Sequence, residues 1–178
     1  YAYDPENPSQ HIIDMSENEI EVPEDYTREE LRQDLLCYTS PVLKEDLVLT
    51  GDMTAELYIS SDAPDTDFVV RVTDVDENGR SIKLADGLLS ARYRNGFARS
   101  EFLQEGEIVC LKIRTTKLSN CFRKGHRIRV TVTSSAKNFI FPNSNTREGF
   151  ASARTVVAHN RVYHGGLHAS RLTVRVEP

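Results

Sequence analysis

The chain contains short segments in which apolar side chains occupy every second position, and this spacing restricts the fold more than any other feature. In residues 53–60, Met53, Ala55, Leu57 and Ile59 alternate with polar or amphipathic side chains. A period of two is typical of a β-strand with one buried face. Segments of this kind predict strands at residues 47–50, 53–60, 68–75, 81–84, 88–93, 107–115, 127–133, 154–158 and 172–176.

These strands predict an all-β protein, built as an antiparallel β-sandwich. No helical pattern of about 12 residues separates them, which excludes a parallel α/β sheet. Residues 68–75 are almost continuously apolar, so we expect them to form a central strand. Asn78-Gly79 and Asp86-Gly87 are typical of tight turns between strands. The long connection at 134–153 favours a jelly roll or Greek key over a simple meander.

The N-terminal region has a different character. Pro5, Pro8 and Pro23 each fix φ and remove a backbone donor, so residues 1–25 are predicted to form an irregular arm. The sequence Thr27-Arg28-Glu29-Glu30 has the pattern of a capping box, in which a threonine and a glutamate bond to each other's backbone N–H groups. We therefore expect a short N-terminal helical turn to follow the arm.

The length of 178 residues is that of one domain, so we expect residues 1–178 to fold as a single unit. The chain does not begin with Met, and its start has neither a basic nor an apolar signal region, so we expect it to belong to a longer polypeptide. No apolar run approaches the roughly 20 residues that span a bilayer. Three cysteines without CxxC spacing favour a reducing compartment and predict a cytoplasmic location.

Charge is divided unevenly along the chain. Residues 1–46 carry 13 acidic and three basic side chains, whereas residues 91–178 carry five acidic and 16 basic ones. The basic residues mostly stand singly between apolar ones, as in 127–132, and form no dense patch with stacking aromatics, so we predict no nucleic-acid binding. We expect the acidic and basic parts to lie against each other.

The sequence offers no catalytic motif. No serine lies in a G-x-S-x-G segment, which positions the nucleophile of an α/β-hydrolase. His159, His164 and His168 follow one another at spacings of five and four residues, and clustered imidazoles are typical of zinc sites. No helical pattern or neighbouring carboxylate accompanies them, and a polar loop is the simpler interpretation. We predict no catalytic residue, metal or cofactor in this chain.

Asp62, Asp65 and Asp67 surround Pro64 between two predicted strands. Clustered carboxylates in a loop can bind calcium, but the glycine and glutamate of an EF-hand loop are missing. Aspartate side chains also accept hydrogen bonds from nearby backbone N–H groups and so stabilise turns. We predict a structural role for the three aspartates, with calcium binding as the alternative.

Phe139, Ile140 and Phe141 form an apolar run within an otherwise polar loop and are candidates for a surface covered by another domain. The chain has no tryptophan, which makes a sugar-stacking platform less obvious. Tyr93, Phe97 and Phe102 remain candidates for stacking or for packing.

Several ordered segments resemble a known family. They include Tyr-Asp-Pro-Glu-Asn-Pro at 3–8 and the segments 34–51, 60–68, 72–80, 86–94 and 122–130. Together they are similar to the C-terminal domain of the CocE/NonD serine hydrolases, which include acyl esterases and Xaa-Pro dipeptidyl-peptidases. The resemblance implies a jelly roll of galactose-binding-like shape. It also implies that the Ser-Asp-His triad lies in a separate, upstream α/β-hydrolase domain.

Two hypotheses for function follow. In the first, the chain is a non-catalytic C-terminal domain that packs on the upstream hydrolase domain and shapes its substrate cleft, with a homo-oligomer as a further partner. In the second, it is a stand-alone module that binds a carbohydrate or another ligand.

Overall fold

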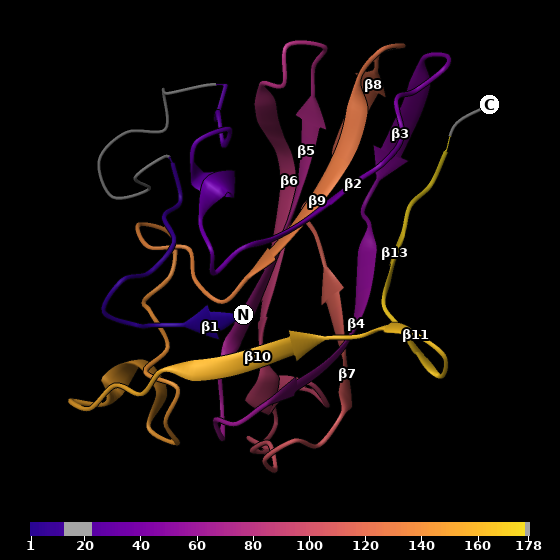
Figure 1. Ribbon diagram of the computed structural model, residues 1–178. Coiled ribbons are helices and arrows are strands. Elements are labelled where there is room, and N and C mark those ends of the chain that lie inside the picture. The colour runs from indigo at the N-terminus through magenta and orange to yellow at the C-terminus, as the bar shows by residue number, and fades with distance from the viewer. Residues whose placement is uncertain (13–22, 177–178) are drawn as a thin grey trace.

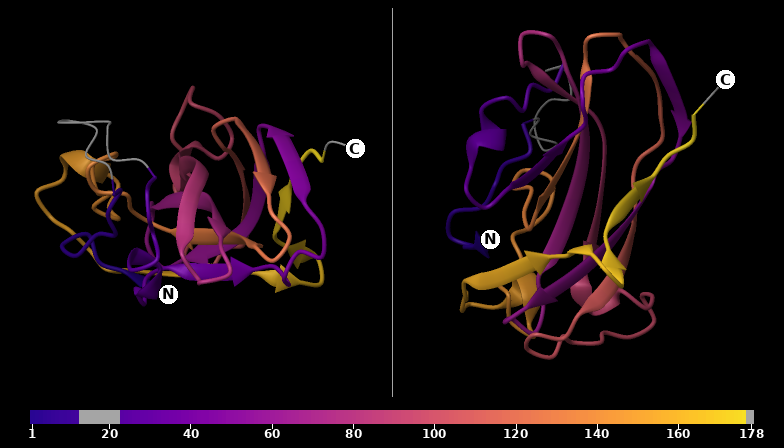
Figure 2. Two further views of the ribbon diagram at one scale, coloured as in Figure 1. Left: turned by 90° about the horizontal axis from the view of Figure 1, so that it is seen from above. Right: turned by 45° about the vertical axis from the view of Figure 1, so that its right-hand side comes forward.

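The computed structural model describes residues 1–12 and 23–176 and places their strands in two facing layers (Figure 1). Every pairing between the strands of these residues is antiparallel. Figure 2 shows the two layers from two further directions. The predicted antiparallel β-sandwich is confirmed, and the jelly-roll order stays a prediction.

The first sheet is built around β4 (Thr54–Ser61), with β7 (Val109–Arg114) along one side. Two strands share the other side of β4. β10 (Ala158–Val162) pairs with residues 59–61, and β13 (Arg171–Thr173) pairs with residues 54–56. β1 (Ala2–Tyr3) extends this sheet beyond β10.

The second sheet has the order β2 (Leu36–Thr39), β9 (Arg127–Thr133), β5 (Asp67–Val75), β6 (Ser81–Ser90). β5 pairs with a strand on each side, so the central strand expected at 68–75 is confirmed. The remaining elements are short. They are the pairs β3 (Leu47–Gly51) with β8 (Leu118–Phe122) and β11 (His164–Gly165) with β12 (His168–Ala169), and the 3-10 turns η1 (Glu29–Leu31), η2 (Ala91–Tyr93) and η3 (Gly149–Ala151).

The main core lies between the two sheets. The alternating side chains of β4 meet those of β5, because both strands turn their apolar faces inward. The buried members of this cluster are Ala55, Leu57, Ile59, Phe68, Val70, Ala91, Leu103, Leu111, Ile113 and Val132. A second cluster forms below β3 and β8, where Leu49, Met53 and Phe122 pack against Val72 and Ala85. The segment that follows β13 runs beside β3, where Leu49 pairs with Val176 (Figure 1).

The N-terminal arm is more ordered than predicted. It contains β1, and the side chains of Tyr3 and His11 are buried. The end of the arm lies beside β6, where Asp25 pairs with Ile82. The ring of Tyr26, the next residue, lies with its centre 4.0 Å from the buried guanidinium of Arg71 in β5. Residues 13–22 of the predicted arm lie outside the described residues.

The expected contact between acidic and basic halves is confirmed by ion pairs. Those joining residues 1–90 to residues 91–178 include Glu30–Arg129, Asp46–Arg123, Asp52–Arg114, Asp65–Arg92 and Glu56–Arg171.

The predicted turn at Asp86-Gly87 is wrong, because β6 runs through both residues without interruption. Glycine is needed there for another reason. A Cβ atom on Gly87 would lie 2.4 Å from the carbonyl oxygen of Arg114 in β7, so the two backbones approach too closely for any side chain. A glycine within a strand often marks such an approach.

Three further features differ from the prediction. The last long strand lies at Ala158–Val162 rather than 154–158, and β8 was missed because serine and asparagine interrupt its apolar pattern. The helical turn exists as η1, but the capping box does not form. The Thr27 hydroxyl accepts the Ser81 N–H instead, and Glu30 is buried beside Arg129.

No helix in the described parts of the chain is long and apolar enough to cross a membrane.

Candidate functional site

The connection from β4 to β5 forms a network of buried polar groups at one end of the sandwich. Asp65 is fully buried. One of its carboxylate oxygens accepts the backbone N–H of Arg92 at 2.9 Å, and the other accepts Nε of Arg92 and the amide of Asn143, both at 2.7 Å. Every oxygen of this carboxylate therefore has a donor, as a buried charge requires.

Arg92 extends the network to the segment between β9 and β10. Its guanidinium donates to the carbonyls of Thr146 at 3.1 Å and Arg147 at 3.0 Å. Gly149 has a φ of 63°, and a Cβ atom there would lie 3.0 Å from Nη2 of Arg92. Asp65 and Arg92 together hold residues 143–149 against the end of the sandwich.

Asp67 is also buried and accepts the Asn143 amide at 2.9 Å. Burial raises the pKa of Asp67 above its ordinary value, and the negative charge of Asp65 raises it further. Hydrogen bonds from Ser90 and Asn143 act in the opposite direction. Of these two neighbouring aspartates, only Asp65 has a direct cationic partner, the guanidinium of Arg92.

The raised pKa of Asp67 predicts a pH dependence of stability. The folded state holds this proton more tightly than the unfolded state, so its contribution is present at low pH and is lost as pH rises through the raised pKa. Asp67→Asn keeps an acceptor for Asn143 and removes the titration. Between about pH 4 and about pH 7, the unfolding free energy of the unaltered chain should fall relative to that of the variant. The difference is about 1.4 kcal/mol for each unit by which the folded-state pKa of Asp67 exceeds the unfolded one, and urea unfolding at each pH measures it.

The exposed Glu105 offers a control for this experiment. Glu105→Gln makes the same carboxylate-to-amide change at the surface and should leave the pH dependence of stability as in the unaltered chain. If the unfolding free energy changes with pH equally in Asp67→Asn and the unaltered chain, the pKa of Asp67 is not raised.

The third aspartate and the histidines have separate partners. The Asp62 carboxylate accepts the backbone N–H of His159 and pairs with its Nδ1, both at 2.7 Å. His164 bonds to Tyr38, and the ring of His168 packs against Tyr58 at 5.3 Å between centroids. The three histidines do not converge, and the described residues contain no group of three metal-type ligands.

Aromatic rings are exposed directly above this buried network. Phe141 and Phe150 stack with their centroids 5.9 Å apart, and they are 79% and 73% exposed. Tyr93 packs against Phe97, which is 79% exposed, at 5.4 Å between centroids. A hollow of about 140 Å³ is lined by Tyr93, Phe141 and Phe150 and has Asp65 and Arg92 in its wall. We call Tyr93, Phe97, Phe141 and Phe150 the aromatic surface.

Residues 1–173 match the model of a family described as the X-Pro dipeptidyl-peptidase C-terminal non-catalytic domain. The chain belongs to this family. The predicted resemblance to the CocE/NonD hydrolases is thereby confirmed, as is the prediction that the chain is a non-catalytic accessory domain.

Relatives of this X-Pro dipeptidyl-peptidase C-terminal domain are much longer than the chain itself. The cocaine esterase of Rhodococcus sp. (strain MB1 Bresler) is 35% identical over 183 residues, which cover 99% of this chain and 32% of that protein. The crystal structure of an aminopeptidase from the marine sediment archaeon Thaumarchaeota archaeon is 25% identical, with a TM-score of 0.91, and the match covers 100% of this chain and 33% of that one.

An α-amino acid ester hydrolase shares the fold of the C-terminal domain, with a TM-score of 0.86 at 22% identity over 99% of this chain and 32% of that chain. The chain thus spans about a third of the length of the relatives that it matches.

The candidate interface residues of this C-terminal domain lie in different surroundings. Phe141 belongs to the aromatic surface, whereas Ile140 is half-buried and Phe139 packs against His11 of the N-terminal arm, with 4.9 Å between the ring centroids. Sequence reasoning missed Phe150, because it stands alone after a glycine in a loop without alternation. The interface role of Phe139, Ile140 and Phe141 stays a prediction.

Proposed function

We propose that residues 1–178 form the accessory domain of a serine hydrolase that acts on esters or Xaa-Pro peptides. In this proposal the domain packs on an α/β-hydrolase domain of the same polypeptide and helps to shape its substrate cleft. The aromatic surface carries the proposal, because four clustered aromatic side chains, two of them stacked in the open, favour burial against a partner.

Two further observations support this proposal. The matched relatives named as an esterase and an aminopeptidase are about three times as long as this chain, which leaves room for a catalytic domain. The Asp65–Arg92 network holds the loops of the aromatic surface, so the surface is presented by a fixed scaffold. We also propose a reducing, cytoplasmic location, since Cys37, Cys110 and Cys121 are free thiols.

The proposal is tested by locating the reactive serine. The full-length polypeptide that contains this chain is treated with a fluorophosphonate, and the labelled peptide is identified by mass spectrometry. We expect one labelled serine outside residues 1–178, and no hydrolysis of p-nitrophenyl esters or Xaa-Pro amides by the 178-residue chain alone. Acyl transfer requires a nucleophile, a base and oxyanion donors in one place. Stoichiometric labelling within residues 1–178 with matching turnover would overturn the proposal.

A further inference from the structure

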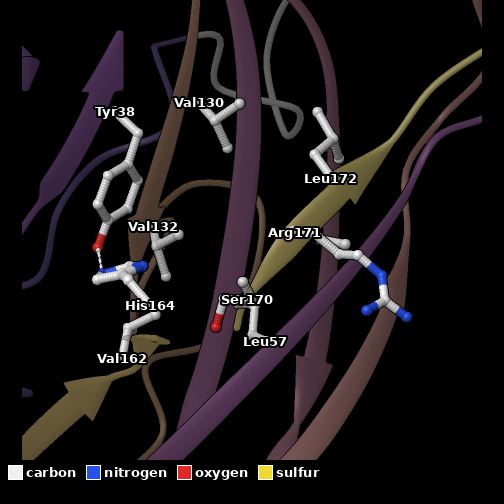
Figure 3. A pocket seen from close by; sticks show the side chains of 10 residues that line it. Tyr38, Leu57, Val130, Val132, Val162, His164, Ser170, Arg171 and Leu172 are labelled. Atoms are coloured by element: carbon white, nitrogen blue, oxygen red, sulfur yellow. Dashed lines mark hydrogen bonds between the residues drawn. The ribbon is translucent and has the colours of Figure 1, made fainter. Parts of the chain in front are cut away.

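A second feature, distinct from the aromatic surface, opens between the two sheets. It is a slot of about 240 Å³ at the edge where β2 and β9 face β4, β10 and β13 (Figure 3). Its walls are mostly aliphatic. The lining side chains are Tyr38, Ala55, Leu57, Val130, Val132, Val162, His164, Ser170, Arg171 and Leu172.

The topology explains why this edge stays open. β10 and β13 pair with different ends of β4, and the β11–β12 hairpin protrudes from the sheet between them. Among the described residues, no strand therefore continues the first sheet along this stretch. The facing side chains of Ala55, Val130 and Val132 are small, so the main core does not fill the gap.

The mouth of the slot carries hydrogen-bonding groups. The hydroxyl of Tyr38 and Nε2 of His164 lie 2.9 Å apart and join the two sheets across the mouth (Figure 3). The Ser170 hydroxyl accepts the Tyr58 N–H and keeps its own proton for another partner. Arg171 turns its guanidinium away from Tyr38 and His164 and pairs with Glu56. The slot thus combines an apolar interior with donors at its rim.

These features determine which kind of molecule fits. A cavity of about 150 Å³ lined by apolar side chains accommodates a benzene ring, so this larger slot has room for a short alkyl chain. A sugar would bury hydroxyl groups against valine and leucine without partners, at considerable cost. The rim donors suit an oxygen head group that accepts hydrogen bonds.

We propose that this slot binds a small aliphatic carboxylate, with its alkyl chain between the sheets and its carboxylate at Tyr38 and His164. All of its lining residues belong to this chain, so the proposal can be tested on the 178-residue chain alone. Binding replaces the Tyr38–His164 hydrogen bond by contacts with the ligand, and no pairing between strands has to break.

The probes are the straight-chain acids butanoate, hexanoate and octanoate, with the alcohols of equal length as neutral counterparts. Binding to the 178-residue chain is measured by calorimetry and by the rise in melting temperature. Each added methylene should strengthen binding by up to about fourfold until the slot is full. Each acid should bind more tightly than its alcohol. Equal affinity of acid and alcohol, or no gain with chain length, would overturn the proposal.

Two variants localise the binding. Val162→Phe places a larger side chain in the half-buried wall of the slot and should reduce octanoate affinity at least tenfold. Val48→Phe is the control, because Val48 is 38% exposed on β3 and does not line the slot. Tyr38→Phe should abolish the preference for acid over alcohol while the gain with chain length remains. Equal octanoate affinity in Val162→Phe and Val48→Phe would contradict the assignment.

Methyl NMR spectra of the unaltered chain give a measurement that no folding defect can disturb. Octanoate should shift the methyl signals of Leu57, Val130 and Val132, which line the slot, and leave those of Val48 in place. Shifts confined to other methyl groups would place the ligand elsewhere and overturn the proposal.

Discussion

Replacing Asp65 by alanine is expected to lower the free energy of unfolding by about 3–5 kcal/mol, the range for removing one partner of a buried ion pair. The carboxylate is fully buried, and its loss leaves Nε of Arg92 without an acceptor and the guanidinium without its counter-charge. It also removes one of the two carboxylates that accept the Asn143 amide. The guanidinium has little access to water, since only 13% of the Arg92 side chain is exposed. Urea unfolding followed by circular dichroism measures the effect.

Asp62→Ala provides the matched control in the same loop. The Asp62 side chain is 41% exposed and pairs with a His159 side chain that is 68% exposed. A surface pair of this kind contributes at most about 1 kcal/mol. Equal losses in the two variants would show that burial does not distinguish the two aspartates.

The same variants decide between the structural role and calcium binding. If the network is structural, we expect the melting temperature to be the same with calcium as with a chelator. A large rise of the melting temperature with calcium, lost in Asp65→Ala, would make the loop a metal site.

The second large effect concerns the aromatic surface in the full-length polypeptide. Changing Phe141 and Phe150 to serine should increase the rate of proteolytic cleavage between the domains by about 30-fold or more. Buried aromatic anchors of an interface typically contribute about 2 kcal/mol or more each, and cleavage follows the population of the opened form. Hydrolase activity should fall with the loss of docking. Limited proteolysis under native conditions measures the rate.

Leu31→Ser is the control for this prediction, since Leu31 is 78% exposed in η1 and lies outside the aromatic surface. The unfolding free energy of the 178-residue chain should be almost unchanged in the Phe141/Phe150 variant, because both rings are already exposed. Cleavage at the same rate as in the unaltered polypeptide would assign the docking role to another face.

The alternation of apolar residues was sufficient to predict the layered all-β architecture. In β4, Ala55, Leu57 and Ile59 all face the core, as their spacing requires, because successive side chains of a strand point to opposite faces. The unbroken apolar pattern of β5 likewise identified a strand with neighbours on both sides. These features depend only on local geometry and on the burial of apolar surface.

The partners of the polar residues could not be obtained in this way. Asp62, Asp65 and Asp67 look alike in the sequence, yet Asp65 meets Arg92 and Asn143, Asp67 is buried without a cation and Asp62 stays at the surface. Contacts between residues so far apart in the chain depend on the packing of loops that have no periodicity. The aromatic surface was missed in part for the same reason.

The sequence by itself determined the antiparallel all-β architecture, the central position of β5 and the family, because alternation and ordered motifs are properties of the chain. Only the tertiary structure decided why Gly87 is a glycine, which aspartate is buried with a cation, and where the sandwich stays open. Each of these depends on the distance between backbones or side chains from different strands, such as β6 against β7 or β2 against the β11 hairpin. A local pattern carries no information about such distances, since they are set by how the two sheets and their connecting loops pack.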